Sequence, residues 1–247
     1  MMSDNPAPAK RPRVLVIMPA WNEEEAITAS IRELRRVAPW ADLVVINDGS
    51  TDRTSAVAKS AGAFVIDLPY NMGVGAAMRT GYKYARRMDY DIALQMDSDG
   101  QHPPEYIETL IAGLERADIV IGSRFAEAKN YKVTGPRKWA MGLLSVMFSA
   151  ISGEKFTDVT SGFRAANRKG INQYCEFFPA EYLGDTIDST VMAIRAGCKV
   201  IQVPVQMRER QGGTPSSGPI KSAIYLVRSF FAFGISMTRK KTSVQEP

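Results

Sequence analysis

The sequence is poor in the residues that most often carry nucleophilic or metal chemistry, with one histidine and two cysteines among 247 residues. A Ser-His-Asp or Cys-His group would have to use His102, which we interpret, next to Pro103, as a turn residue. Cys175 and Cys198 form no C-x-x-C motif and have no paired histidine, which argues against a dithiol redox centre or a zinc site. We expect ordinary thiols of a protein in a reducing cytoplasm.

Long hydrophobic runs are also missing. Residues 1–13 are rich in Pro, Ala and charge and precede only the short apolar run 14–18, so we expect neither a signal peptide nor a spanning segment there. We expect a disordered tail over 1–12 and one globular domain over 13–219. The net charge of +5 would suit nucleotide phosphates, anionic lipid headgroups or nucleic acid, and we expect no nucleic-acid partner.

What the chain does have is an alternation of strands and helices. Apolar runs of the kind that buried parallel strands require occur at 14–18, 43–46, 64–66, 92–96, 118–124 and 200–205. Pro19 is expected to end the first strand, and Asn22 is expected to cap a helix whose first turn begins at Glu23. The alternation predicts an α/β fold with a mixed, mostly parallel sheet flanked by helices, in which ligands bind beyond the carboxyl ends of the strands.

Two carboxylates, Asp97 and Asp99, follow the fourth of these runs. If strand alternation continues past Met96, both lie on one face, and Gln101 continues the same parity. Paired carboxylate oxygens with an amide oxygen suit Mg²⁺ or Mn²⁺, which leave other positions for water and substrate phosphates. Taken alone, the spacing is equally compatible with solvated loop acids.

Other polar clusters follow neighbouring strands, namely Pro19 to Glu23, Asp48 within 47–52, and Gly73-x-Gly75. Singly, Asp48 is compatible with a simple turn residue, and Gly73-x-Gly75 lacks the third glycine of a dinucleotide fingerprint, so we do not expect NAD. Together with the aspartates, these clusters predict one polar rim along a sheet edge, where a nucleotide would fit.

A series of motifs then carries a family resemblance. The motifs are, in order, Pro19 to Glu24, Asn47 to Asp52, Asn71-x-Gly73-x-Gly75, Asp97-x-Asp99-Gly100-Gln101-His102-Pro103, Gly122 to Arg124, and Asp158-x-Thr160-Ser161-Gly162-Phe163-Arg164. The series resembles the family 2 glycosyltransferases, and among them the dolichol- and polyprenyl-phosphate mannose synthases, from about Val14 to about Ser217. The resemblance implies the nucleotide-diphosphosugar transferase fold, known as GT-A.

The resemblance also implies roles for individual residues. The nucleotide sugar would be bound by Pro19, Trp21, Asn22, Glu23, Asp48, Gly73, Asp97 and Ser98, and the metal by Asp97, Asp99 and Gln101. The catalytic set would be Asp97, Asp99, Arg124, Arg164 and Arg210. Trp21 stands where tyrosine is commoner in the family, which keeps a stacking surface but changes the hydroxyl hydrogen bond.

The second half is expected to hold the acceptor. The acceptor phosphate would be bound by Arg137, Ser161, Arg164, Arg210 and Ser216, although Pro215 is inserted before Ser216 relative to the family's loop. The hydroxyls and guanidinium within Thr160 to Arg164 suit an anionic group. The apolar helix expected at 139–151 is either a buried core helix or an acceptor-side helix that touches lipid. By the resemblance, an acidic residue in the segment with Asp185 and Asp188 would lie near the active site.

The expected reaction follows from the acceptor. A phosphate monoester is largely dianionic at neutral pH and needs no protein base, which agrees with the single histidine. We therefore expect metal-dependent, inverting transfer of a hexose, mannose from GDP-mannose before a UDP-hexose such as UDP-glucose, to polyprenyl phosphate. Transfer to a sugar hydroxyl, a sugar-1-phosphate nucleotidyltransferase and a non-catalytic binding module remain alternatives.

The C-terminal segment predicts membrane contact. Residues 220–238 form an expected amphipathic helix with a broad apolar face, followed by a basic tail over 239–247. Apolar burial and attraction to anionic lipid would act together, so we expect peripheral association at the cytoplasmic face of the membrane. A docked helix on the protein's own core or on another subunit is the alternative. The family resemblance adds a small membrane-spanning partner subunit, and a homo-oligomer is the other assembly that we expect.

Overall fold

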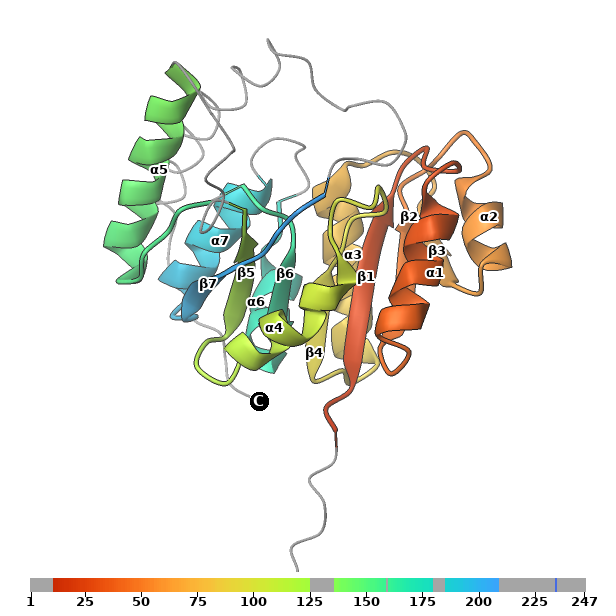
Figure 1. Cartoon of the computed structure of the whole chain (residues 1–247), viewed down its shortest axis with the longest axis horizontal. Coiled ribbons are helices and arrows are strands. Elements are labelled where there is room, and N and C mark those ends of the chain that lie inside the picture. Colours follow the sequence, from red (N-terminus) through yellow and green to blue (C-terminus); the bar gives the residue numbers. More distant parts are fainter. Residues whose placement is uncertain (1–10, 125–135, 159, 180–184, 209–233, 235–247) are drawn as a thin grey trace, which may run out of the picture.

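The computed structural model describes residues 11–124, 136–158, 160–179, 185–208 and 234. Within them the chain forms a seven-stranded sheet with helices on both faces (Figure 1). The strands are β1 (Val14–Ala20), β2 (Asp42–Asn47), β3 (Phe64–Asp67), β4 (Ile92–Gln95), β5 (Ile119–Ser123), β6 (Arg164–Asn167) and β7 (Val200–Pro204). The helices are α1 (Ile27–Val37), α2 (Thr54–Ser60), α3 (Val74–Arg87), the 3₁₀ turn η1 (Pro104–Tyr106), α4 (Ile107–Gly113), α5 (Pro136–Ser152), α6 (Arg168–Glu176) and α7 (Asp185–Arg195).

The strand order across the sheet is β3-β2-β1-β4-β6-β5-β7. β6 runs antiparallel to both of its neighbours, β4 and β5, while the other described pairs are parallel. The expected α/β fold with a mixed, mostly parallel sheet is therefore confirmed. The sequence pattern does not predict β6, because this short strand has two alanines between polar ends and no apolar run.

Alternate side chains of β1 enter two different cores, because successive side chains of a strand point to opposite faces. Leu15 and Ile17 join a core with residues of α3, α5, α6 and α7, whereas Val14 and Val16 join a core with residues of α1, α2 and α4. Helix α3 approaches β1 so closely that a Cβ at Gly81 would lie 2.3 Å from Ile17 Cγ2. The sheet is thus the middle of three layers.

The expectation that Pro19 ends the first strand is wrong, because β1 continues to Ala20. Ile17 O accepts a bond from Met96 N on the β4 side, whereas Ala20 O accepts one from Asp48 N on the β2 side. Pro19 has the same parity as Ile17 and so faces β4 beyond the end of that strand. Its missing N–H therefore costs no bond in the sheet.

The first helix begins at Ile27 rather than at Glu23, and Asn22 does not cap it. Asn22 instead has a φ of 53°, a left-handed conformation that asparagine tolerates better than most residues. Its Oδ1 accepts the N–H of Thr51 at 2.9 Å, and its own N–H donates to Ser50 Oγ at 3.0 Å. The residue therefore joins the loop after β1 to the loop after β2.

Helix α5 is not a fully buried core helix. Leu144 and Phe148 are completely buried, but Leu143 and Val146 on its other side are 55% and 66% exposed. The helix lies at the outer end of the sheet, beyond β5 and β7 (Figure 1). In the described parts of the chain, every helix is too short or too polar to cross a membrane.

Some expectations fall outside the described residues. These are the tail before Arg11, the helix 220–238 apart from Gly234, the tail 239–247, and the side chains of Arg137, Asp185, Arg210 and Ser216.

Candidate active site

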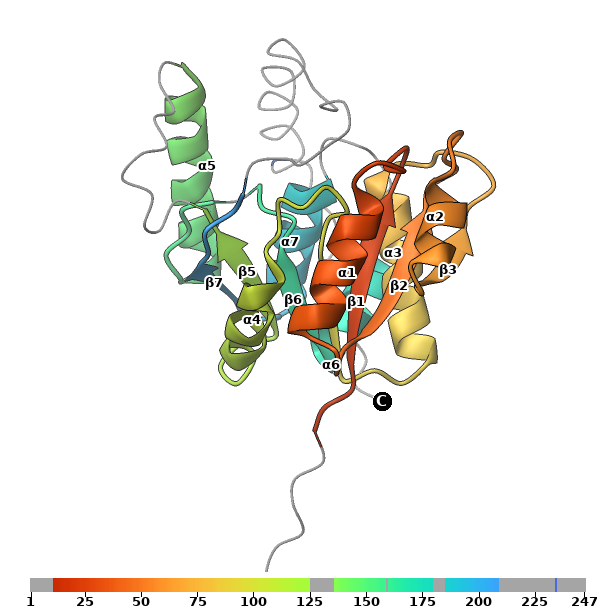
Figure 2. The same ribbon diagram turned by 45° about the vertical axis from the view of Figure 1, so that its right-hand side comes forward.

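The loop that carries Asp97 and Asp99 leaves the carboxyl end of β4, at the sheet edge where β1 and β2 also end (Figures 1 and 2). Because β4 ends at Gln95, the alternation argument for the two aspartates does not apply. The chain turns instead, and Gln101 N donates to Asp99 Oδ1 at 3.0 Å. Asp97 keeps 35% of its side chain exposed, whereas Asp99 is buried.

His102 is held against Asp97. Its Nδ1 accepts the N–H of Asp97 at 2.9 Å, and its Nε2 lies 3.6 Å from Asp97 Oδ2. The buried ring stacks on Phe163, with 4.8 Å between the ring centroids. Because Nδ1 accepts a hydrogen bond, the neutral ring carries its hydrogen on Nε2, on the side of the carboxylate. The histidine is part of the turn, as its position beside Pro103 predicts, and it supports Asp97.

The chain before β6 passes directly beside Asp97. A Cβ at Gly162 would lie 2.8 Å from Gln95 Nε2 and 3.6 Å from Asp97 Oδ2, so glycine lets the chain pass close to the Gln95 amide and within contact distance of this carboxylate. Gln95 Nε2 also donates to Asp97 Oδ1 at 3.3 Å. Sequence reasoning missed Gln95, although a glutamine at the end of a buried apolar strand is a signal that could have identified it.

The residues predicted to bind the nucleotide sugar gather at the same sheet edge. Trp21 is 50% exposed and Asn22 is also exposed, whereas Pro19, Glu23, Asp48 and Ser98 are buried. Glu23 N donates to Thr54 Oγ1 at 2.8 Å, which ties the first loop to the start of α2. Trp21 and Asn22 are therefore the most exposed members of this rim, and the buried members fix the loops beneath them.

Asp48 links the loops after β2 and β3. One of its carboxylate oxygens accepts the N–H of Met72 and the other accepts the N–H of Gly73, each at 2.8 Å. Gly73 has a φ of 90°, which few other residues adopt. The assigned contact of Asp48 with a nucleoside stays a prediction, while its structural role in closing this loop is evident.

Arg124, at the end of β5, is paired with a fully buried carboxylate. Its Nε donates to Asp158 Oδ2 at 2.7 Å and its Nη2 to Asp158 Oδ1 at 3.1 Å. Burial alone would raise the pKa of Asp158, but the hydrogen bonds and charge of Arg124, together with bonds from Thr160, lower it below 3.8. Arg124, predicted to be catalytic, thus fixes the Asp158 to Arg164 segment against β5.

Gln202 of β7 supports the same segment and was also missed from the sequence. Its Oε1 accepts the N–H of Thr157 at 2.7 Å, and its Nε2 donates to the carbonyl oxygen of Asp158. As with Gln95, the signal is a polar residue within an apolar strand.

Ser161 and Arg164 depart from the expectation that they contact the acceptor phosphate. Both side chains are buried in the described structure, Arg164 completely. The Arg164 guanidinium donates to Ser161 O at 2.8 Å and lies 3.3 to 3.4 Å from the hydroxyls of Tyr174, Ser189 and Thr190. The Arg164 side chain therefore lies among residues of α6 and α7 rather than at the exposed edge of the site.

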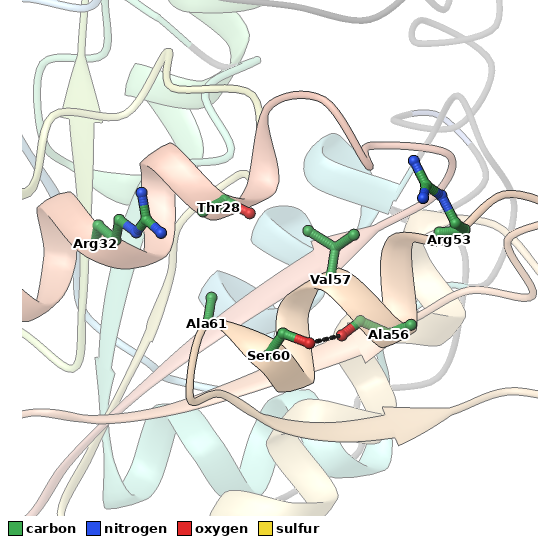
Figure 3. Close-up of a pocket in the computed structure, with 7 residues that line it drawn as sticks. All are labelled: Thr28, Arg32, Arg53, Ala56, Val57, Ser60 and Ala61. Atoms are coloured by element: carbon green, nitrogen blue, oxygen red, sulfur yellow. Dashed lines mark hydrogen bonds between the residues drawn. The ribbon is translucent and has the colours of Figure 1, made fainter.

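The described residues also form two surface pockets outside the aspartate loop. One lies between α1 and α2 and is lined by Thr28, Arg32, Arg53, Ala56, Val57, Ser60 and Ala61 (Figure 3). Its Arg53 is already paired with Glu24 at 3.2 Å. The other is lined by ion-paired residues that include Asp91, directly before β4, and so lies at the opposite end of that strand. Neither contains a residue predicted for the site.

The oxygens at the aspartate loop fit a hard divalent cation. Asp97 and Asp99 would supply carboxylates, and the half-buried Gln101 would supply an amide oxygen. In the part of the chain that the structure describes, no three His, Cys, Asp or Glu side chains form a metal-binding group. Two carboxylates are sufficient for Mg²⁺ or Mn²⁺ when water and substrate phosphates complete the coordination. Asp97, with 35% of its side chain exposed, is the more accessible of the two carboxylates, because Asp99 is buried.

The fold is shared with solved glycosyltransferases of the GT-A class. Glucosyl-3-phosphoglycerate synthase from Mycobacterium tuberculosis, in complex with Mn²⁺, UDP and phosphoglyceric acid, superposes with a TM-score of 0.71. The likeness covers 94% of this chain and 80% of that one at 20% sequence identity, so it shows the fold alone.

The family described as Glycosyl transferase family 2 matches residues 15–175, and the chain belongs to it. It is 30% identical to undecaprenyl-phosphate mannosyltransferase of Micrococcus luteus, over 84% of this chain and 89% of the relative. It is 29% identical to polyprenol monophosphomannose synthase of Mycolicibacterium smegmatis, over 87% and 85% of the two chains. The protein is therefore a glycosyltransferase.

Proposed function

We propose that the protein transfers a hexose from a nucleoside diphosphate sugar to a polyprenyl phosphate, with GDP-mannose as the donor. The observation that carries this proposal is the placement of Asp97, which is partly exposed at the carboxyl ends of the strands and flanked by His102 and Gly162. The names of the relatives from Micrococcus luteus and Mycolicibacterium smegmatis support the choice of sugar and lipid.

In this reaction an oxygen of the acceptor phosphate attacks the anomeric carbon of the sugar. The bond between that carbon and the diphosphate oxygen breaks, and the nucleoside diphosphate leaves with the electron pair, so the configuration inverts. The acceptor is already largely dianionic at neutral pH and gives up no proton. This agrees with His102, whose Nδ1 is committed to the Asp97 N–H and whose ring is buried.

Metal binding, nucleobase stacking and acceptor binding are assigned to different residues of the chain. Asp97, Asp99 and Gln101 would hold Mg²⁺ or Mn²⁺, which when bound would neutralise charge on the leaving diphosphate. Trp21, exposed at the rim, offers a stacking surface for the nucleobase. Arg137, Arg210 and Ser216 remain the predicted acceptor ligands, whereas Arg124, Ser161 and Arg164 would act by positioning the adjacent loops.

The test is a panel of donors and acceptors. The protein is mixed with GDP-mannose, UDP-glucose or UDP-N-acetylglucosamine, with a short-chain polyprenyl phosphate or a free sugar as acceptor, and with Mg²⁺, Mn²⁺ or a chelator. We expect release of GDP and formation of a mannosyl phosphate lipid, only with metal. Turnover with UDP-glucose alone would show that the donor is UDP-glucose rather than GDP-mannose. Transfer only to a sugar hydroxyl would contradict the assignment of polyprenyl phosphate as the acceptor.

The same panel tests the aspartates. Asp97→Ala and Asp99→Ala should each lower turnover by about 10²-fold or more, as expected when charge stabilisation in the transition state is removed. The matched control is Glu108→Ala on α4, because Glu108 is 75% exposed and weakly paired with Arg11 at 3.6 Å. Full activity of Asp99→Ala in Mg²⁺ would contradict the metal assignment.

We further propose peripheral association with the inner face of the membrane through 220–238, alone or with a small membrane-spanning partner or a second copy. Flotation with anionic liposomes of the intact chain and of a chain truncated after Pro219 tests this anchor. We expect salt-sensitive flotation of the intact chain only. Equal flotation of both chains would remove the anchor from the proposal.

A further inference from the structure

Arg208, which follows β7, makes a charged clamp behind the aspartate loop. Its Nη1 lies 2.8 and 3.0 Å from the two carboxylate oxygens of Glu33 on α1, and its Nη2 lies 2.7 Å from Glu105 Oε1 in η1. The planar guanidinium is suited to this arrangement, because its separate N–H groups can engage two carboxylates at once. A lysine ammonium at the same position lacks that fork.

The main chain of Arg208 joins the same loop directly. Its N–H donates to the carbonyl oxygen of Gln101 at 3.1 Å. At the other end of the loop, Ser30 Oγ donates to Ser98 O at 2.8 Å. Ser30 and Glu33 are three residues apart on α1 and therefore share a face of that helix. Helix α1 thus holds Ser98 directly and Gln101 through Arg208.

We propose that Arg208 is a positioning residue for the divalent cation and its diphosphate ligand. The clamp fixes the segment from Ser98 to Gln101, and so the places of Asp99 and Gln101, by joining α1, η1 and the end of β7. It also neutralises Glu33 and Glu105, two carboxylates that would otherwise add negative charge near the loop. This inference rests on the proposed function, because it assumes that Asp99 and Gln101 face a metal-bound nucleoside diphosphate.

The test measures metal binding as well as turnover. Binding of Mn²⁺ is followed by electron paramagnetic resonance in the presence of GDP and without acceptor, for the full chain and for Arg208→Met, Arg208→Lys and Glu33→Gln. Arg208→Met keeps the backbone N–H and the apolar stem but loses the guanidinium. The control is Arg86→Met, which breaks a surface ion pair of 2.9 Å with Glu176 between α3 and α6.

We expect Arg208→Met to weaken Mn²⁺ binding about tenfold, the lower end of the loss seen when residues behind metal ligands are changed. The Mn²⁺ affinities of Arg208→Lys and Glu33→Gln should lie between those of Arg208→Met and the unaltered protein. A higher Mn²⁺ concentration should restore much of the turnover of all three variants. Arg86→Met should bind Mn²⁺ normally. Unaltered Mn²⁺ affinity in a folded Arg208→Met would overturn the inference alone, whereas absence of Mn²⁺ and GDP binding by the unaltered protein would overturn the proposed metal site with it.

Discussion

Replacement of Asp158 by asparagine is the sharpest test of how the site is held together. The carboxylate is fully buried, and both of its oxygens are occupied. Oδ1 accepts from Arg124 Nη2 at 3.1 Å and from Thr160 N at 3.1 Å, and Oδ2 accepts from Arg124 Nε at 2.7 Å. An asparagine amide keeps the shape, but whichever way it is turned its NH₂ group faces a donor.

The expected loss of stability follows from the burial of the pair. Removal of one partner from a fully buried ion pair costs about 3–5 kcal/mol. Because the Arg124 side chain is 37% exposed, water can solvate it in part, and we reduce the expectation to about 2–3 kcal/mol. For a chain of this size that corresponds to a fall in Tm of roughly 4–12 °C.

The pH dependence has a definite sign. The folded pKa of Asp158 lies below 3.8, its ordinary value. The ion pair therefore stabilises the fold fully above that value, and its contribution is lost as the pH falls through the folded pKa. The difference in stability between the unaltered protein and Asp158→Asn should shrink as the pH falls below about 4.

Unfolding by urea, followed by circular dichroism between pH 7 and pH 3.5, measures both quantities. The matched control is Asp89→Asn, since Asp89 has a side chain that is 74% exposed in a surface ion pair with Arg168. It also has a φ of 59°, which asparagine tolerates. A change below about 1 kcal/mol at pH 7 for Asp158→Asn, or a difference that persists unchanged in acid, would refute the reasoning.

Three further experiments test other parts of the site and core. Gly162→Ala would place a Cβ 2.8 Å from Gln95 Nε2 and beside Asp97 Oδ2. We therefore expect turnover to fall at least about tenfold and the Mn²⁺ concentration needed for half-maximal turnover to rise. An unchanged dependence of turnover on Mn²⁺ concentration would contradict this expectation. His102→Asn can keep an acceptor for the Asp97 N–H, so it should retain more Mn²⁺ affinity than His102→Leu, and equal losses would show that this bond is unimportant. Burial raises the pKa of Cys198 to about 11 and also raises that of Cys175. A thiol reagent at pH 8 should therefore modify the native protein slowly and the urea-unfolded protein rapidly. Rapid stoichiometric labelling of the native protein would contradict this expectation.

Much of the fold could be predicted from the sequence, because the buried parallel strands have continuous apolar runs. The runs at 14–18 and 43–46 correspond to β1 and β2, whose pairing sets the strand-end loops at one edge. β6 could not be predicted in this way, since its pairing with β4 and β5 supplies stability that its own residues do not signal.

The tertiary contacts among the predicted site residues could not be read from the sequence. Asp97 and Gly162 belong to motifs visible in the sequence, yet their close approach depends on the reversed direction of β6. The Arg124–Asp158 pair joins residues 34 apart in the chain, and the Arg208–Glu33 pair joins residues 175 apart. No local pattern encodes such pairs, because the tertiary fold brings the partners together.

Because β6 runs antiparallel to its neighbour β5, the two ends of the segment that connects them lie side by side in the sheet. The segment leaves the sheet at Ser123 and returns at Phe163, where Gly122 N donates to Phe163 O at 2.8 Å, and the Arg124–Asp158 pair closes its base. The described residues between these two points, including α5, therefore lie outside the strand pairing of the sheet. Because the entropic cost of closing a loop grows slowly with its length, a change in the length of α5 would leave the strand register unaltered, whereas Gly162 near the end of the segment is constrained by its contacts with Gln95 and Asp97.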